Sequence, residues 1–184
     1  MKLAIFINGF AESGKDETVK QMTQVMGEHQ FAVSAVSSID PIRNMLRAAG
    51  YDVDNKTPEM RALLAEVGDA CEKFDGTKTK YAVEKTLEYL NARRDGAVFV
   101  HVREPAMIDK MFGMLPDSIT PITVLIRRPG KLGVSSNKAD SDVMSMSYMD
   151  TIDNDGTVDD LRKKCNYVFT MWRMKYDNTK TFAG

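Results

Sequence analysis

One short segment, Gly9–Lys15, constrains the fold of this chain more than any other feature of its 184 residues. It matches the pattern G-x-x-x-x-G-K, in which glycines let the backbone turn so that successive N–H groups face phosphate oxygens. The continuous apolar run Lys2–Asn8 precedes it, as expected of a strand buried on both faces. A stretch from about Lys15 to Glu28 follows, with apolar residues at helical spacing. The order of strand, glycine loop and helix predicts a phosphate-binding loop.

The chemistry of such a loop assigns roles to its residues. The start of the helix adds its positive dipole end, and Lys15 reaches the β- and γ-phosphates of a nucleoside triphosphate as a flexible point charge. Asp16 stands where the usual pattern has Ser or Thr. Its carboxylate is either a ligand of Mg²⁺ or only an acid favoured by the helix dipole. The expected nucleotide contacts are Gly9, Ala11, Glu12, Ser13, Gly14, Lys15, Asp16 and Glu17.

The rest of the chain alternates short apolar runs with helical patterns. The runs are Phe31–Val36, Ala97–Val102, Ile122–Ile126 and, as a fifth strand, Tyr148–Ile152. This alternation predicts an α/β fold with a mainly parallel sheet of about five strands and helices on both faces. Together with the loop Gly9–Lys15 it predicts a three-layer α/β/α P-loop NTPase. Helices are expected from Asp40 at the N-cap to Gly50, from Pro58, over Tyr81–Arg94, Ala106–Met114 and Thr157–Lys164, with Tyr167–Met171 as a terminal strand or extended tail.

Composition narrows the class of protein. A formal net charge of −1 disfavours a broad nucleic-acid-binding face. Cys71 and Cys165 are too few for a disulfide framework, and no apolar run approaches the roughly 20 residues that span a bilayer. The short, quickly polar start of the chain does not resemble a signal peptide. We therefore expect a cytoplasmic protein that binds small molecules, with neither nucleic acid nor membrane as a partner. Homodimer formation is left open.

Arginines follow two of the predicted strands, where ligands of open α/β sheets bind. Arg103 comes directly after Ala97–Val102, and Arg127 and Arg128 come directly after Ile122–Ile126. Phosphoryl transfer needs positive charge around the moving group, so these three residues are expected to act in catalysis together with Lys15. Instead of contacting substrate or phosphate, Arg103 could form an ordinary ion pair with a neighbouring acid such as Glu104. One of Arg127 and Arg128 is expected to face solvent.

Several short motifs resemble, in order, those of phage-type deoxynucleoside monophosphate kinases and, more distantly, phosphomevalonate kinases. The loop Ser13–Thr18 is similar to their SGKD-type loop, and Asp40-Pro41-Ile42-Arg43 is similar to their substrate-side segment. The stretches Arg61–Gly68, Val102–Glu104 and Asn154–Leu161 continue the resemblance. His101 stands where that family commonly has an aspartate near the metal.

The resemblance implies a kinase that moves the γ-phosphoryl group of ATP, with Mg²⁺, onto a (deoxy)nucleoside monophosphate. It implies substrate contacts from Asp40, Arg43, Arg61 and Arg103. Asp40 could instead serve only to cap its helix, and Arg43 and Arg61 could instead be ordinary helix-surface residues. The chain is then one kinase domain over residues 1–184, with a helical acceptor-binding insertion at about 38–95 and a lid at about 127–147. A phage-encoded enzyme would work in the host cytoplasm. The alternatives are a kinase of another small phosphorylated metabolite, such as phosphomevalonate, and a nucleotide-binding module without turnover.

Overall fold

The computed structural model describes residues 1–55, 57–130 and 143–177. Its strands are β1 (Lys2–Asn8), β2 (Ala32–Ser37), β3 (Gly96–His101), β4 (Thr120–Arg127) and β5 (Asp150–Asp153). Its α-helices are α1 (Lys15–Glu28), α2 (Asp40–Ala48), α3 (Pro58–Asp75), α4 (Thr77–Asn91), α5 (Pro105–Met114) and α7 (Val158–Asp177), and a short 3-10 helix covers Val143–Ser145. None of the helices described is long and apolar enough to cross a membrane.

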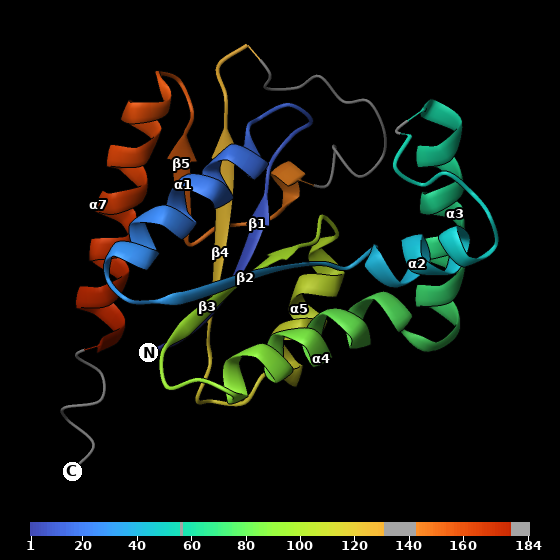
Figure 1. The fold of residues 1–184 in the computed structure, drawn as a ribbon, viewed down its shortest axis with the longest axis horizontal. Coiled ribbons are helices and arrows are strands. Elements are labelled where there is room, and N and C mark those ends of the chain that lie inside the picture. Colours follow the sequence, from blue (N-terminus) through green and yellow to red (C-terminus); the bar gives the residue numbers. More distant parts are fainter. Residues whose placement is uncertain (56, 131–142, 178–184) are drawn as a thin grey trace.

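All five strands are parallel and lie in the order β2-β3-β1-β4-β5. Successive side chains of β1 point to opposite faces of the sheet. Leu3, Ile5 and Ile7 pack with α1 and α7, whereas Ala4 and Phe6 pack with α4 and α5. Figure 1 shows these helix pairs on the two sides of the sheet. The predicted three-layer α/β/α class with a parallel sheet is confirmed.

Helices α2 and α3 lie to one side of the sheet, at the right in Figure 1. They share a small apolar cluster of their own, in which Ile42 and Leu46 of α2 meet Leu64 of α3 and Val53 of the connecting turn. Together with α4 they make up the connection between β2 and β3. Most of the predicted lid, residues 131–142, lies outside the described residues.

Most element predictions are confirmed within a few residues, but two element boundaries and one whole element differ. Helix α4 begins at Thr77, not at Tyr81. The pattern of apolar residues did not reveal the first turn, because its buried residues Lys78 and Thr79 are polar. Asp40 is the first residue of α2, and Ile39 is the N-cap. The Asp40 carboxylate instead accepts a hydrogen bond from the backbone N–H of Ser37 (3.0 Å), so it closes the turn between β2 and α2.

The prediction of a terminal strand or tail over Tyr167–Met171 is wrong. Helix α7 continues through this stretch to Asp177. Its buried residues, Leu161, Cys165, Phe169 and Trp172, are three or four positions apart and form one helical face against the sheet. The Trp172 indole N–H also donates to Asp150 at the start of β5 (2.7 Å), which fixes the second half of the helix.

Candidate active site

The loop between β1 and α1 has the backbone conformation that its glycines permit. Gly9 and Gly14 have φ angles of 152° and 88°, in the region that side chains rarely adopt. A β-carbon on Gly9 would lie 2.5 Å from the carbonyl oxygen of Ile126. Glu12, with φ of 59°, is a non-glycine residue in the left-handed region, and the Ser13 N–H turns back to the Phe10 carbonyl (3.2 Å). The segment therefore forms a tight loop at the carboxyl ends of the parallel strands.

The loop opens directly into α1. Gly14 is the N-cap, and since it has no side chain it cannot satisfy the N–H groups of the first helical turn. Those N–H groups and the positive end of the helix dipole suit an anion. The Lys15 ammonium donates to the carbonyls of Gly9 (2.6 Å) and Phe10 (2.8 Å), so the cation is held against the loop backbone. This arrangement offers both dipolar and full positive charge to phosphate groups.

Other predicted loop contacts differ in how their side chains lie. The Glu17 carboxylate accepts from Gln21 along α1 (2.7 Å), so it is engaged within the helix. The Ser13 hydroxyl is buried and lacks a hydrogen-bond partner within the described chain. Asp16 is exposed in the first turn of α1. Asp16 is the more exposed of the two carboxylates in the first turn of the helix.

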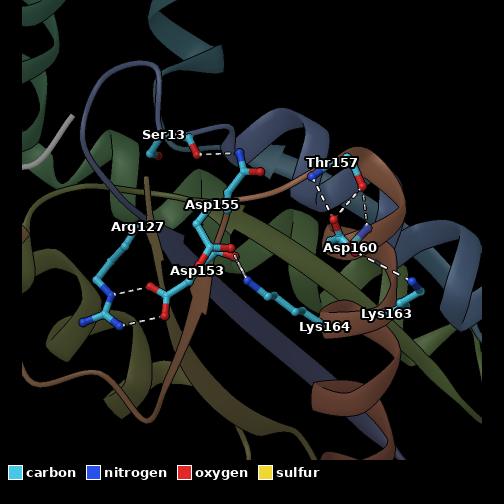
Figure 2. A network of polar contacts seen from close by, with 9 residues as sticks. Ser13, Arg127, Asp153, Asp155, Thr157, Asp160, Lys163 and Lys164 are labelled. Atoms are coloured by element: carbon cyan, nitrogen blue, oxygen red, sulfur yellow. Dashed lines mark hydrogen bonds and ion pairs between the residues drawn. The ribbon is translucent and has the colours of Figure 1, made fainter. Parts of the chain in front are cut away.

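Asn154, in the turn between β5 and α7, holds the phosphate loop in place. Its side-chain amide donates to the carbonyl of Ser13 (3.0 Å), and its backbone N–H donates to the carbonyl of Arg127 (2.7 Å). Figure 2 shows the hydrogen bond to the Ser13 carbonyl among the polar contacts of this turn. The motif that contains Asn154 was recognised in the sequence, but this residue was not among the predicted site residues.

The two arginines after β4 have different environments. Arg127 makes two hydrogen bonds to the Asp153 carboxylate, 2.7 Å from Nε and 2.9 Å from Nη2 (Figure 2). These hydrogen bonds and the opposite charges lower the pKa of Asp153 and raise that of Arg127. Arg128 instead lines a cavity of about 140 Å³ with Pro129, Asn154, Asp155 and Gly156. Arg128 is therefore the arginine placed beside an opening next to the phosphate loop.

The turn behind this cavity is held by further polar contacts. The Lys164 ammonium donates to the carbonyl of Asp153 (2.8 Å) and contacts the Asp155 carboxylate. Thr157 and Asp160 bind each other through side chain and backbone at the start of α7 (Figure 2). These contacts fix the wall of the cavity to α7.

His101 ends β3, in register with Ile7 of β1 and Ser37 of β2. Its imidazole is half-buried, and burial lowers its pKa below the ordinary value. Four charged side chains are near enough to modulate that pKa: Asp16 and Asp40 raise it, whereas Lys15 and Arg43 lower it. His101 therefore lies between the phosphate loop and the start of α2, where Arg43 pairs with Asp40 at 3.4 Å.

Arg103 follows β3 at the same rim. Its backbone carbonyl accepts a hydrogen bond from the Asn8 side-chain amide (3.1 Å), and the side-chain oxygen Oδ1 of Asn8 accepts from the backbone N–H of Gly9 (2.8 Å). The structure therefore links Arg103 to the phosphate loop through one asparagine, which the sequence patterns did not single out. Arg61 is exposed in the first turn of α3, and its predicted contact with an acceptor stays a prediction.

Within the described residues, no group of three or more histidines, cysteines or acids could hold a metal ion. Magnesium, however, is commonly bound through one or two carboxylates and the phosphates of its nucleotide. The exposed carboxylate of Asp16, in the turn that follows Lys15, fits that mode of binding.

No protein-family model and no curated protein matches this chain. Solved structures do resemble it. A mutant of the APS kinase of Mycobacterium tuberculosis is 14% identical, with 92% of this chain and 97% of that chain covered and a TM-score of 0.49. The dephospho-CoA kinase from Campylobacter jejuni is 16% identical (91% and 96% covered, TM-score 0.47), and a sugar kinase from Janibacter sp. HTCC2649 is 10% identical (92% and 95% covered, TM-score 0.49). At such identities and TM-scores these likenesses assign no activity to the chain.

Proposed function

We propose that this protein is a kinase that transfers the γ-phosphoryl group of ATP to a (deoxy)nucleoside monophosphate. The observation that carries the proposal is the loop Gly9–Lys15, whose positive-φ glycines, uncapped helix start and folded-back lysine suit a polyphosphate. Its place at the carboxyl ends of parallel strands is where open α/β sheets bind ligands.

The donor nucleotide is proposed to extend from this loop toward the turn held by Asn154. Phosphates take the place of the Gly9 and Phe10 carbonyls as partners of the Lys15 ammonium. The base enters the cavity beside Arg128, whose planar guanidinium can stack on a ring. Asp16 would hold Mg²⁺, which would supply positive charge near the transferred group.

The acceptor is proposed to bind on the other side of the loop, toward α2 and α3. Asp40 and Arg43 lie there near His101, and Arg103 lies at the end of the neighbouring strand. Arg43, Arg61 and Arg103 would bind the acceptor phosphate, because guanidinium groups suit phosphate geometry. The helical segment 38–95 is then the acceptor-binding insertion of a single domain 1–184, and 127–147 is its lid.

The test is an ADP-release assay over the common nucleoside monophosphates. Wild-type protein is expected to release ADP with at least one of them, and Lys15→Ala is expected to lose turnover while its circular dichroism and thermal midpoint stay near those of wild type. Lys20→Ala removes an exposed lysine from the same helix and serves as the matched control. Equal turnover by Lys15→Ala would exclude the proposed role of the loop.

His101 favours one alternative, a nucleotide-binding module without turnover. Burial lowers the pKa of this imidazole and so disfavours a positive charge on the ring. A histidine in either protonation state cannot supply the negative charge of the aspartate that the resemblance implies there. ATP binding without ADP release, whatever acceptor is added, would support this alternative. Stimulation only by another phosphorylated metabolite, such as phosphomevalonate, would instead change the proposed acceptor.

A further inference from the structure

Arg103 is held by its backbone from two directions. From the phosphate loop, the Asn8 amide donates to its carbonyl (3.1 Å). From the other side, its N–H donates to Oε2 of Glu104 (3.2 Å), the residue that caps α5. Neither contact depends on the Arg103 side chain. The position of this residue at the rim is therefore set by Asn8 and Glu104 together.

Glu104 is in turn held by Lys78, a buried lysine in the first turn of α4 that is only 4% exposed to solvent. The Lys78 ammonium donates to Oε1 of Glu104 (2.9 Å) and to Oδ1 of Asp69 on α3 (3.1 Å). Burial by itself would lower the pKa of Lys78, but the hydrogen bonds and negative charges of Glu104 and Asp69 outweigh it and raise that pKa. Lys78 is thus charged and joins two elements that are not neighbours in sequence.

The stem of Lys78 is also fixed by packing. A β-carbon on Gly68 of α3 would lie 3.4 Å from Cδ of Lys78 and 2.9 Å from Cδ1 of Ile39. Helix α3 therefore passes close to this stem, and the ammonium has little room to move away from Asp69 and Glu104. A change in the position of α3 would be carried to the lysine directly.

These contacts form one unbroken polar chain: Gly9, Asn8, the Arg103 backbone, Glu104, Lys78 and Asp69. We propose that Lys78 is a positioning residue that couples the donor loop to the acceptor-side helix α3 through the backbone of Arg103. The proposal rests on the proposed function, because it takes α3 as part of the acceptor site. Binding of the donor then orders α3, and loss of Lys78 uncouples the two sides without removing either.

Deuterium exchange of backbone amides tests the coupling without knowledge of the acceptor. A non-hydrolysable ATP analogue with Mg²⁺ is added to wild-type protein and to Lys78→Met, and exchange is followed in peptides from the phosphate loop and from α3. In wild type we expect slower exchange in both regions. In Lys78→Met we expect slower exchange in the phosphate loop alone. Lys78→Arg, which keeps the charge, is expected to restore much of the effect in α3.

Two further variants separate coupling from simple loss of stability. Lys85→Met removes an exposed lysine from the same helix, one that pairs only at the surface with Glu88 (2.7 Å), and is expected to behave as wild type. Lys78→Met combined with Glu104→Gln removes the less exposed of the two carboxylates that pair with Lys78, and Asp69, the other one, is exposed to solvent. The double variant is expected to show the same loss in α3 as Lys78→Met. Once an acceptor is identified, Lys78→Met should raise its KM about tenfold while the KM for ATP changes far less.

Protection of α3 in Lys78→Met equal to that in wild type would overturn the proposal. So would a wild-type protein in which the analogue protects the phosphate loop and leaves α3 unchanged. Failure of the analogue to protect even the phosphate loop of wild type is a different result, because it would refute the proposed donor site and the coupling with it.

Discussion

The side-chain amide of Asn154 donates a 3.0 Å hydrogen bond to the carbonyl of Ser13 and fills the space that a β-carbon on Gly14 would need. These residues are 141 positions apart in the chain. The turn after the last strand thus supports the loop after the first one. Since the same turn lines the cavity beside Arg128, the phosphate loop and the proposed base site are built as one unit.

Replacement of Asn154 by alanine should therefore weaken nucleotide binding more than it weakens the fold. The variant loses one hydrogen bond to the loop, worth about 1 kcal/mol in the free energy of unfolding. We expect the affinity for ATP to fall about tenfold, because the loop backbone is no longer held in its binding conformation. Titration calorimetry with ATP and denaturation with urea measure the two effects. Asn166→Ala, at an exposed position of α7, is the control. Unchanged ATP affinity in Asn154→Ala would show that the loop does not need this support.

A pair of glycine substitutions tests the same contact from the other side. Gly14→Ala forces a side chain onto a residue with φ of 88° and into the Asn154 amide, so we expect loss of ATP binding and a destabilisation of more than about 1 kcal/mol. Gly27→Ala, in the last turn of α1, meets no atom within 4 Å and should stabilise the protein by roughly 0.5 kcal/mol. Thermal unfolding of the two variants with and without ATP measures both stability and ATP binding. A Gly14→Ala variant more stable than Gly27→Ala would contradict the loop geometry.

The phosphate loop and the parallel sheet could be predicted because their signals are local. Glycine spacing and continuous apolar runs are patterns within a few residues of the sequence. The elements that they predict, β1, the loop and α1, are present in the structure. The roles of Asn8, Lys78 and Glu104 could not be found in this way. They depend on two contacts between distant positions, Asn8 with Arg103 (95 residues apart) and Lys78 with Glu104 (26 residues apart). The second half of α7 was missed for a related reason. The stretch Tyr167–Met171 consists of aromatic, β-branched and other apolar residues, so a short window suggests a strand, although Phe169 is its only fully buried residue in the structure.

The environments of Arg127 and Arg128 lead to a prediction that separates them. Arg127 is already paired with Asp153 at the surface, so Arg127→Ala should change ATP affinity little, and surface pairs of this kind contribute little to stability. Arg128→Ala removes a wall of the cavity and should lower the affinity for ATP several-fold. Affinity for inorganic triphosphate should stay the same in Arg128→Ala, because the phosphate loop is intact. A larger loss of ATP affinity in Arg127→Ala would reverse the assignment.

Gln30 offers a test of backbone strain away from the site. It follows α1 with φ of 62°, and the N–H of Phe31 closes the helix end by donating to the carbonyl of Met26 (3.0 Å). Glycine adopts this conformation without steric cost, so Gln30→Gly should raise the free energy of unfolding by about 0.5 kcal/mol. Gln30→Ala keeps the β-carbon and should bring no gain. Urea denaturation of the three proteins decides the matter, and nucleotide binding should be equal in all of them.

The half-buried imidazole of His101 predicts how stability depends on pH. Burial lowers its pKa in the folded protein below 6.5, while the unfolded chain keeps the ordinary value. Above that value the ring is neutral in both states and adds no pH dependence. As the pH falls below about 6.5, the unfolded chain binds a proton that the folded protein resists, so wild type loses stability until the folded pKa is passed.

His101→Gln lacks this titration, so its free energy of unfolding should fall less between pH 7 and pH 5. Parallel curves for wild type and His101→Gln would mean that His101 is protonated as readily in the folded protein as in solution. The ring would then carry a positive charge between Asp16 and Asp40 in mildly acidic solution.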